Sequence, residues 1–347
     1  MPLLYVTEPG AVIRRAGGSL VVTLDSEADG DPATPPGTRT TLLEVEPHRL
    51  EGIVAFGRVH VTREALFLCV EQGIAVAWTT AGGKAIARVV PPDARMADLA
   101  LAQYRAHEEP ARHLSLARGI VQAKILNAAE VLEDIQSNVP GDARLSDAIA
   151  GLKVGAVRAS AAETAESLLG IEGTGARTYF GAWGAGLRPP FAFLGRRRRP
   201  PPDPVNALLS LGYVLLGQRI EGALHARGLD PGIGFFHELR PGRPSLALDL
   251  LEELRHPLVD RCVQRACNLQ VLSPSDFEDD PEDTGGVRLT RPGLKAFLEA
   301  WEKTLAQPLR ELGCEPIAAD RLIQRQVDRI AADLRGGNSY RPFRYGD

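Results

Sequence analysis

The segment from Gly234 to Asp260 carries residue types that suit metal chemistry on phosphate esters. A single histidine, His237, follows two phenylalanines in a stretch rich in glycine and proline, so we expect it on irregular backbone. The apolar residues further on recur with helical spacing, and Asp249, Glu252 and Glu253 fall on the opposite, polar stripe. A helix here would place Asp249 and Glu252 on one face. An imidazole and carboxylates gathered in this way could bind a divalent cation.

The same polar stripe is also typical of the solvated side of an ordinary amphipathic helix. Three arginines around the histidine, Arg240, Arg243 and Arg255, favour a site, because guanidinium groups bind phosphate oxygens in pairs. Both interpretations stay open on this segment alone. In either of them we expect Glu253 to be a solvated neighbour of the functional acids.

A further acid, Glu172, lies in the string GIEGTGARTYFGAWG. We expect it at the start of a helix over 172–183, where the neighbouring glycines would let DNA or another backbone come close. Tyr179 then lies two turns further along the same helical face. Glu172 could supply the third ligand to a metal bound by His237 and Glu252. It could also be an acid that stabilises the helix N-terminus through the helix dipole.

A run of four arginines precedes a proline-rich turn and a helix that we expect over 204–227. Asn206 and Tyr213 are seven residues apart, which places them on one face of that helix. The arginines could bind a phosphate backbone while Asn206 and Tyr213 position the strand, or they could form a solvated loop. The run consists of Arg196, Arg197, Arg198 and Arg199.

Composition limits the class of protein. The chain has 347 residues, of which 44% are hydrophobic and 24% charged, as in globular proteins with real cores. Its net charge of -4 argues against a protein that coats nucleic acid through bulk charge. No apolar run is long enough for a membrane span, and the N-terminus does not resemble a signal peptide, so we expect a cytoplasmic protein without membrane association. The four cysteines form no CxxC pair, and we expect reduced thiols.

The order of the expected elements predicts an α+β fold with two domains. Short β-branched or alternating runs with one helix indicate a β-rich domain over residues 1–90. A proline-rich linker over 91–96 would follow it, and then a larger all-α catalytic domain over 97–335. The tail over 336–347 is polar and aromatic, and we expect it to be loosely held or to dock late. Two of the helices expected in the second domain cover 144–169 and 258–270.

Four motifs in a fixed order are similar to those of a known family. They are LYVTEPGA, EGTGARTYF, RRRRPPPDPVNALLSLGY and HELRPGRPSLALDLLEELRHPLVD. Over nearly its whole length the chain resembles Cas1, the CRISPR-associated integrase and endonuclease of spacer acquisition. The resemblance implies a β-rich N-terminal domain, a helical C-terminal domain and a homodimer. It implies that Glu172, His237 and Glu252 are the metal triad, with Asp249 as an accessory acid.

The resemblance also implies a reaction. The 3′-hydroxyl ends of captured double-stranded DNA would be joined to the CRISPR repeat by transesterification, and a partner protein, Cas2, would bridge two dimers. Two carboxylates and an imidazole suit Mg²⁺ or Mn²⁺ better than a closed zinc site. Two alternatives remain: a stand-alone metal-dependent nuclease for branched or repair DNA, and a catalytically silent DNA-binding or scaffold module.

Overall fold

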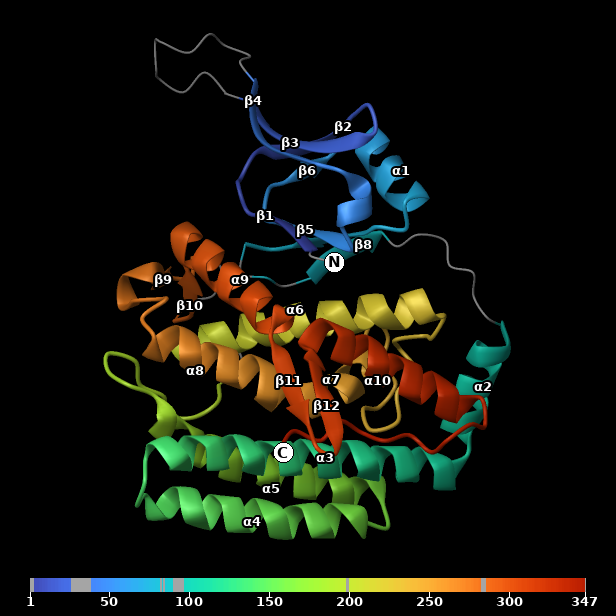
Figure 1. The fold of residues 1–347 in the computed structure, drawn as a ribbon, viewed down its shortest axis with the longest axis vertical. Helices are drawn as coiled ribbons and strands as arrows, with labels where there is room; N and C mark the ends of the chain where they lie inside the picture. Colours follow the sequence, from blue (N-terminus) through green and yellow to red (C-terminus); the bar gives the residue numbers. More distant parts are fainter. Residues whose placement is uncertain are drawn as a thin grey trace. The chain divides into compact units, whose positions relative to one another are not determined.

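The computed structural model describes residues 3–25, 39–81, 83, 85–89, 97–197, 200–281 and 285–346. The chain separates into two compact units, Met1–Asp93 and Ala94–Asp347. The fold is α+β as predicted: the first unit is β-rich and the second is mostly helical (Figure 1). The expected linker over 91–96 lies outside the described residues.

Among its described residues, the first unit contains two four-stranded sheets and one α-helix. Strands β1, β5 and β7 run parallel and β8 antiparallel, in the order β1-β5-β7-β8. The second sheet has the order β4-β3-β2-β6, with β6 parallel to β2. The strands are β1 (Leu3–Val6), β2 (Ala11–Ala16), β3 (Ser19–Asp25), β4 (Arg39–Val45), β5 (Gly52–Phe56), β6 (His60–Val61), β7 (Ala75–Thr79) and β8 (Ala85–Val89).

Both sheets contribute to one core. Ile13 from β2 and Ile53 from β5 are buried together with Leu68 of α1 (Arg63–Glu71). Thr62 caps α1 by accepting a hydrogen bond from Ala65 N, as the position of a threonine before an apolar run predicts. A short 3-10 turn, η1 (Pro47–Arg49), precedes β5.

In the second unit, α7 is enclosed between other helices. It packs against α3 on one side and α6 on the other, and α3 also packs against α4 and α5 (Figure 1). The longer helices are α2 (Ala97–Glu108), α3 (Pro110–Asn138), α4 (Ala143–Ser160), α5 (Ala165–Trp183), α6 (Pro204–Arg227), α7 (Ser245–Arg255), α8 (Arg261–Asn268), α9 (Arg291–Ala306) and α10 (Ala319–Leu334). Two short hairpins add β9 (Phe277–Asp279) with β10 (Val287–Leu289), and β11 (Pro308–Glu311) with β12 (Cys314–Ala318).

The predicted helix boundaries around Glu172 are wrong. The helix expected over 144–169 ends at Ser160, and α5 begins at Ala165 because Thr164 accepts a hydrogen bond from Ser167 N. Glu172 is therefore the eighth residue of α5, about two turns from its start. The helix-dipole interpretation of Glu172 falls with this boundary, because that effect is confined to the first turn.

A π-helical turn, η3 (His256–Asp260), connects α7 to α8, so the helix expected over 258–270 is part of one continuous helical stretch. Pro257 has no backbone N–H and cannot bond to the carbonyl of Glu253 one turn earlier. Asn127 Nδ2 of α3 donates to that carbonyl instead, at 2.7 Å. Wide turns of this kind are frequent beside functional sites.

The C-terminal tail is docked rather than loose. Phe343 and Tyr345 are buried, and Tyr345 N donates to Asn127 Oδ1 at 2.8 Å. In the part of the chain that the structure describes, no helix is long and apolar enough to cross a membrane.

Candidate active site

Three helices and one loop bring the predicted metal ligands together. Glu172 extends from α5 and Glu252 from α7, and both carboxylates contact Lys124 of α3. His237 lies on the loop before α7, with its Nε2 3.9 Å from Glu252 Oε1. Sixty-five residues of sequence separate Glu172 from His237, and the packing of α5 and α7 against α3 closes that separation.

Asp249 fixes the position of His237. Its Oδ1 accepts hydrogen bonds from His237 N at 2.9 Å and from His237 Nδ1 at 2.8 Å. Its Oδ2 accepts from Phe235 N at 2.6 Å and Phe236 N at 3.1 Å. With Nδ1 donating to a carboxylate, the lone pair of His237 lies on Nε2, which faces Glu252. Asp249 is thus a positioning acid.

The loop carrying His237 is held from two sides. A Cβ on Gly234 would lie 2.7 Å from Asp249 Oδ2 and 2.7 Å from the backbone of Ser245, so only glycine fits this close approach. On the other side, Gln103 Nε2 of α2 donates to the carbonyls of Asp230 and Ile233, at 2.8 and 2.9 Å. Ser245 does not cap α7, because its hydroxyl donates to the carbonyl of Glu238 instead.

Glu252 is buried among positive charges. Its carboxylate lies 2.5 Å from Lys124 Nζ and 3.0 Å from Arg255 Nη1. Burial raises the pKa of Glu252, but the charges of Arg255 and Lys124 outweigh burial and hold that pKa well below its usual range. The interpretation of the polar stripe as the solvated side of an amphipathic helix is wrong. Both faces of α7 are buried, and the side chains of its acids contact other buried residues.

Lys124 was not predicted from the sequence as a residue of the site. It is 3% exposed and its ammonium lies between the carboxylates of Glu172 and Glu252. A signal was present: Lys124 and Asn127 fall among the apolar positions of the run GIVQAKILNAA, on the face of α3 that a helical period buries. A buried lysine requires a partner of opposite charge, and none could be assigned from the local sequence.

Glu253 was expected to face solvent, and this expectation is wrong. Its side chain is fully buried and accepts hydrogen bonds from Tyr340 Oη at 2.6 Å, Phe343 N at 2.7 Å and Gln326 Nε2 at 2.9 Å. Burial raises the pKa of Glu253 to about 7 even though these hydrogen bonds lower it. Glu253 therefore binds the docked tail to α7.

An aromatic and ionic network connects the arginine loop to Glu252. The guanidinium of Arg255 stacks on the Tyr213 ring with Cζ 4.2 Å from its centre, and Arg196 Cζ lies 5.4 Å from the same centre. Tyr213 Oη donates to Asp260 Oδ1 at 2.5 Å, and Asp260 Oδ2 pairs with His256 Nδ1 at 2.6 Å. Arg255 is buried by these contacts, so it positions Glu252 and is not placed to bind DNA directly.

Tyr179 packs against His256, one of the residues of this network. Its ring centre is 4.1 Å from that of His256, and its side chain is fully buried. Burial, reinforced by the nearby Asp260 carboxylate, raises its pKa well above the usual range. Tyr179 packs against His256 of the π-helical turn, and because its side chain is fully buried it cannot contact a bound DNA strand.

The prediction that Asn206 contacts DNA is also contradicted, because Asn206 is fully buried. Its Oδ1 accepts from Arg197 N at 2.8 Å and Arg196 Nη1 at 2.9 Å, and its Nδ2 donates to Gly195 O and Asp203 Oδ2. Asn206 therefore shapes the loop that presents the arginines.

The remaining predicted DNA-binding residues differ in exposure. Arg197 and Arg240 are exposed, and Arg240 pairs with Glu238 at 2.9 Å. Arg243 is half-buried. Arg198 and Arg199 lie outside the described residues. Of the arginines predicted to bind DNA, Arg197 and Arg240 are thus the exposed ones among the described residues and the candidates for contacts with phosphates.

The donor set fits a divalent cation. Among the described residues, no three His, Cys, Asp or Glu side chains lie close enough together to hold a metal ion as they stand, and Lys124 Nζ lies between the carboxylates of Glu172 and Glu252. Glu172 and Glu252 nevertheless share one positive charge, and His237 Nε2 lies 3.9 Å from Glu252 Oε1. Two carboxylates and an imidazole oriented by a second acid are ligands that Mg²⁺ and Mn²⁺ accept.

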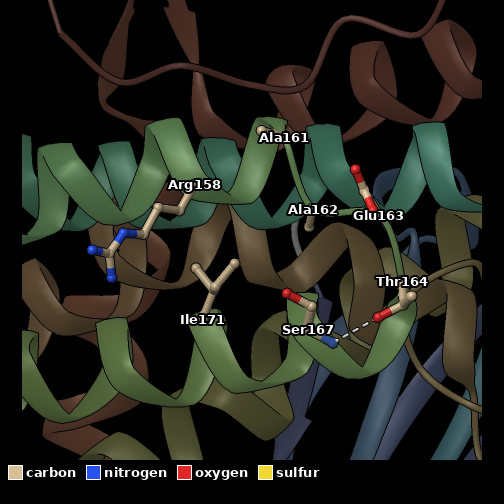
Figure 2. Close-up of a pocket in the computed structure, with 7 residues that line it drawn as sticks. All are labelled: Arg158, Ala161, Ala162, Glu163, Thr164, Ser167 and Ile171. Carbon is tan, nitrogen blue, oxygen red and sulfur yellow. Dashed lines mark hydrogen bonds between the residues drawn. The ribbon is translucent and has the colours of Figure 1, made fainter.

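A separate depression lies between the end of α4 and the start of α5 (Figure 2). It has a volume of about 590 Å³ and is lined by Arg158, Glu163, Thr164, Ser167 and Ile171, among others. Ile171 precedes Glu172 in the chain, but none of the predicted metal ligands lines this depression. Its lining combines polar, charged and apolar side chains, and these residues form no cluster of catalytic side chains.

The two-domain fold is that of known Cas1 structures. Over all of this chain and 99% of the other, it matches a Cas1 protein from Thermotoga maritima with a TM-score of 0.80 at 22% identity. A casposase bound to an integration product matches with a TM-score of 0.81 at 23% identity, over 98% of this chain and 92% of the casposase.

Sequence comparison defines the family. The family described as CRISPR associated protein Cas1 matches residues 4–303, and the chain belongs to it. It is 37% identical to "CRISPR-associated endonuclease Cas1 2" of Rhodospirillum rubrum, over 98% of this chain and 97% of the relative. It is 35% identical to "CRISPR-associated endonuclease Cas1 3" of Thermus thermophilus, over 94% and 90% of the two chains.

Proposed function

We propose that this protein is a DNA endonuclease and integrase of CRISPR adaptation that depends on Mg²⁺ or Mn²⁺. It would join the 3′-hydroxyl ends of captured DNA to the CRISPR repeat by transesterification. The observation that supports the proposal is that Glu172 and Glu252 share one cation, Lys124, while His237, oriented by Asp249, has its Nε2 3.9 Å from Glu252.

The names of related proteins support the same activity. The relatives in Rhodospirillum and Thermus are named endonucleases, and the casposase of the same fold is bound to an integration product. A further chain of similar fold belongs to a Cas6-RT-Cas1–Cas2 complex, with a TM-score of 0.81. We therefore propose double-stranded DNA as substrate, a Cas2 protein as partner and a homodimer as the working unit, acting in the cytoplasm.

The residues of the site divide the work. A bound Mg²⁺ or Mn²⁺ would lower the pKa of a 3′-hydroxyl or water and neutralise charge on the attacked phosphate. Asp249 keeps the lone pair of His237 Nε2 directed at the site, and Arg255 keeps the Glu252 carboxylate in place. Arg197 and Arg240 are exposed and could bind the DNA backbone beside it. With a 3′-hydroxyl as nucleophile the products are joined strands, and with water they are cleaved strands.

A strand-transfer assay tests the proposal. Labelled duplex DNA is incubated with a repeat-containing plasmid, Mn²⁺ or Mg²⁺, and the protein with or without a Cas2 partner. We expect joined products that EDTA abolishes and that Glu172→Gln, His237→Ala and Glu252→Gln each reduce by at least 100-fold. Glu163→Gln is the matched control, because this exposed acid lies near Glu172 in the chain but contacts none of the three ligands.

The outcomes separate the alternatives. Cleavage without joined product under every partner condition would favour the stand-alone nuclease. Cleavage and joining that survive all three substitutions would remove the proposed metal centre from the reaction.

A further inference from the structure

The cation between Glu172 and Glu252 is part of the chain itself. Lys124 Nζ contacts Glu172 Oε1 and lies 2.5 Å from Glu252 Oε2, with only 4% of its side chain exposed. Glu172, with 17% of its side chain exposed, and His237, with 16%, are the more open edge of the cluster. Lys124 thus enters from the protein interior, opposite the side from which solvent has access.

Lys124 balances charge where the two carboxylates approach each other. Two carboxylates that approach each other repel, and a cation between them offsets this repulsion. Arg255 contributes a second positive charge, but of the two carboxylates its described contacts are with Glu252. Among the described contacts, the one that joins Glu172 to Glu252 is Lys124.

A divalent cation at the same position would repel the ammonium group. Like charges a few ångströms apart in a partly buried site are strongly unfavourable, so Lys124 cannot keep both contacts when a metal is bound. Its four-carbon stem is flexible enough to withdraw the charge by several ångströms without a change in α3. The backbone of the site could therefore remain as it is while one side chain moves.

We propose that Lys124 is an internal counter-ion that occupies the place of the metal and competes with it. This inference rests on the metal centre proposed above. Lys124 holds the carboxylates of Glu172 and Glu252 together before metal arrives, at the cost of weaker metal binding. Metal uptake is then a displacement of Lys124 rather than the filling of an open site.

Direct Mn²⁺ binding tests the competition without any assay of activity. Free Mn²⁺ is measured by electron paramagnetic resonance during titration of the full-length protein and three variants. Lys124→Met removes the charge and keeps the length of the side chain, while Lys124→Arg keeps the charge. Lys153→Met is the control, because Lys153 pairs with Glu133 in an exposed salt bridge away from the site. Thermal unfolding of each variant is recorded with and without Mn²⁺.

We expect Lys124→Met to bind Mn²⁺ at least 10-fold more tightly than the unaltered protein. Its melting temperature without metal should fall, and the rise on adding Mn²⁺ should be larger than for the unaltered protein. Lys124→Arg should keep the metal-free stability and bind Mn²⁺ no more tightly, and Lys153→Met should leave Mn²⁺ affinity unchanged.

Two results would overturn the inference, and they differ in what else they overturn. Equal or weaker Mn²⁺ binding by folded Lys124→Met would refute competition and leave the metal centre standing. Absence of Mn²⁺ binding by both the unaltered protein and Lys124→Met would refute the metal centre, and the competition with it. A fourth variant, Glu172→Gln, identifies the site wherever Mn²⁺ binding is seen, because Mn²⁺ bound there must be lost in this variant.

Discussion

Glu252 and Glu253 are neighbours on α7, both buried, and their environments are opposite. Glu252 faces Lys124, Arg255 and His237, and although burial raises its pKa, the charges of Arg255 and Lys124 hold that pKa well below the usual range. Glu253 faces neutral donors from α10 and the C-terminal tail, and burial raises its pKa to about 7. A carboxylate surrounded by cations is held ionised and can serve as a ligand. A carboxyl group that only receives neutral hydrogen bonds serves the packing of the tail.

The strongest test of this contrast is the pair Glu252→Gln and Glu253→Gln. Glu252→Gln should lower nuclease and strand-transfer rates by about 10²- to 10³-fold, the loss typical of removing a group that stabilises charge in the transition state. Glu253→Gln should retain more than half of the activity at a temperature where it is folded. Rates measured side by side decide, and a comparable loss in both variants would contradict the division of roles.

The raised pKa of Glu253 predicts how stability depends on pH. Its pKa is higher in the folded protein than its ordinary value of 4.5, so the folded state binds the proton more tightly. Stability contributed by this group is full below pH 4.5 and falls by up to about 3 kcal/mol as the pH rises to about 7. Urea unfolding at several pH values should show this fall in the unaltered protein and a flatter profile in Glu253→Gln. Identical profiles would contradict the raised pKa.

The tail should contribute stability through one hydroxyl. Tyr340→Phe removes the donor to Glu253 Oε1 and should lower the free energy of unfolding by about 1–2 kcal/mol. Tyr104→Phe is the matched control, since its hydroxyl makes only a long, exposed contact of 3.4 Å with Asp230. Chemical denaturation compares the two. Equal effects would mean that the Tyr340 contact adds nothing specific.

A smaller effect on catalysis is expected from Tyr213, which acts on the environment of Glu252. Tyr213→Phe keeps the ring under Arg255 and removes the hydrogen bond to Asp260. Because this residue acts on Glu252 only through Arg255, we expect a 3- to 10-fold loss in catalytic rate. The affinity for DNA, measured without metal, should be unchanged. Weaker DNA binding with an unaltered rate would instead indicate that Tyr213 contacts the strand.

The sequence predicted the α+β fold and most element positions, because helical and strand periodicities are local signals. It placed the break between the two helices after residue 169, whereas α4 ends at Ser160 and Thr164 caps the start of α5. The all-α expectation for the second domain also overlooked two hairpins of three to five residues per strand, which are too short for a clear alternation.

The site was predictable in its residue types and less so in its contacts. Glu172, His237 and Glu252 were selected from the sequence. In the structure Glu172 and Glu252 both contact Lys124 and His237 lies beside Glu252, while their role as ligands stays a prediction. Asn206 and Arg255 were predicted to contact DNA, but both are buried. The sequence does not show which other parts of the chain will bury a polar residue on a helix. The burial of Glu253 depends on a tail about ninety residues further along the chain, and no local pattern encodes such a contact.

The most direct test of the central claim is anomalous diffraction from crystals of the protein grown or soaked with Mn²⁺. We predict one strong manganese peak at about 2.0–2.3 Å from oxygens of Glu172 and Glu252 and from His237 Nε2, with Lys124 Nζ withdrawn from the two carboxylates. A manganese peak elsewhere, or no peak with Lys124 still joining Glu172 to Glu252 at saturating Mn²⁺, would contradict it.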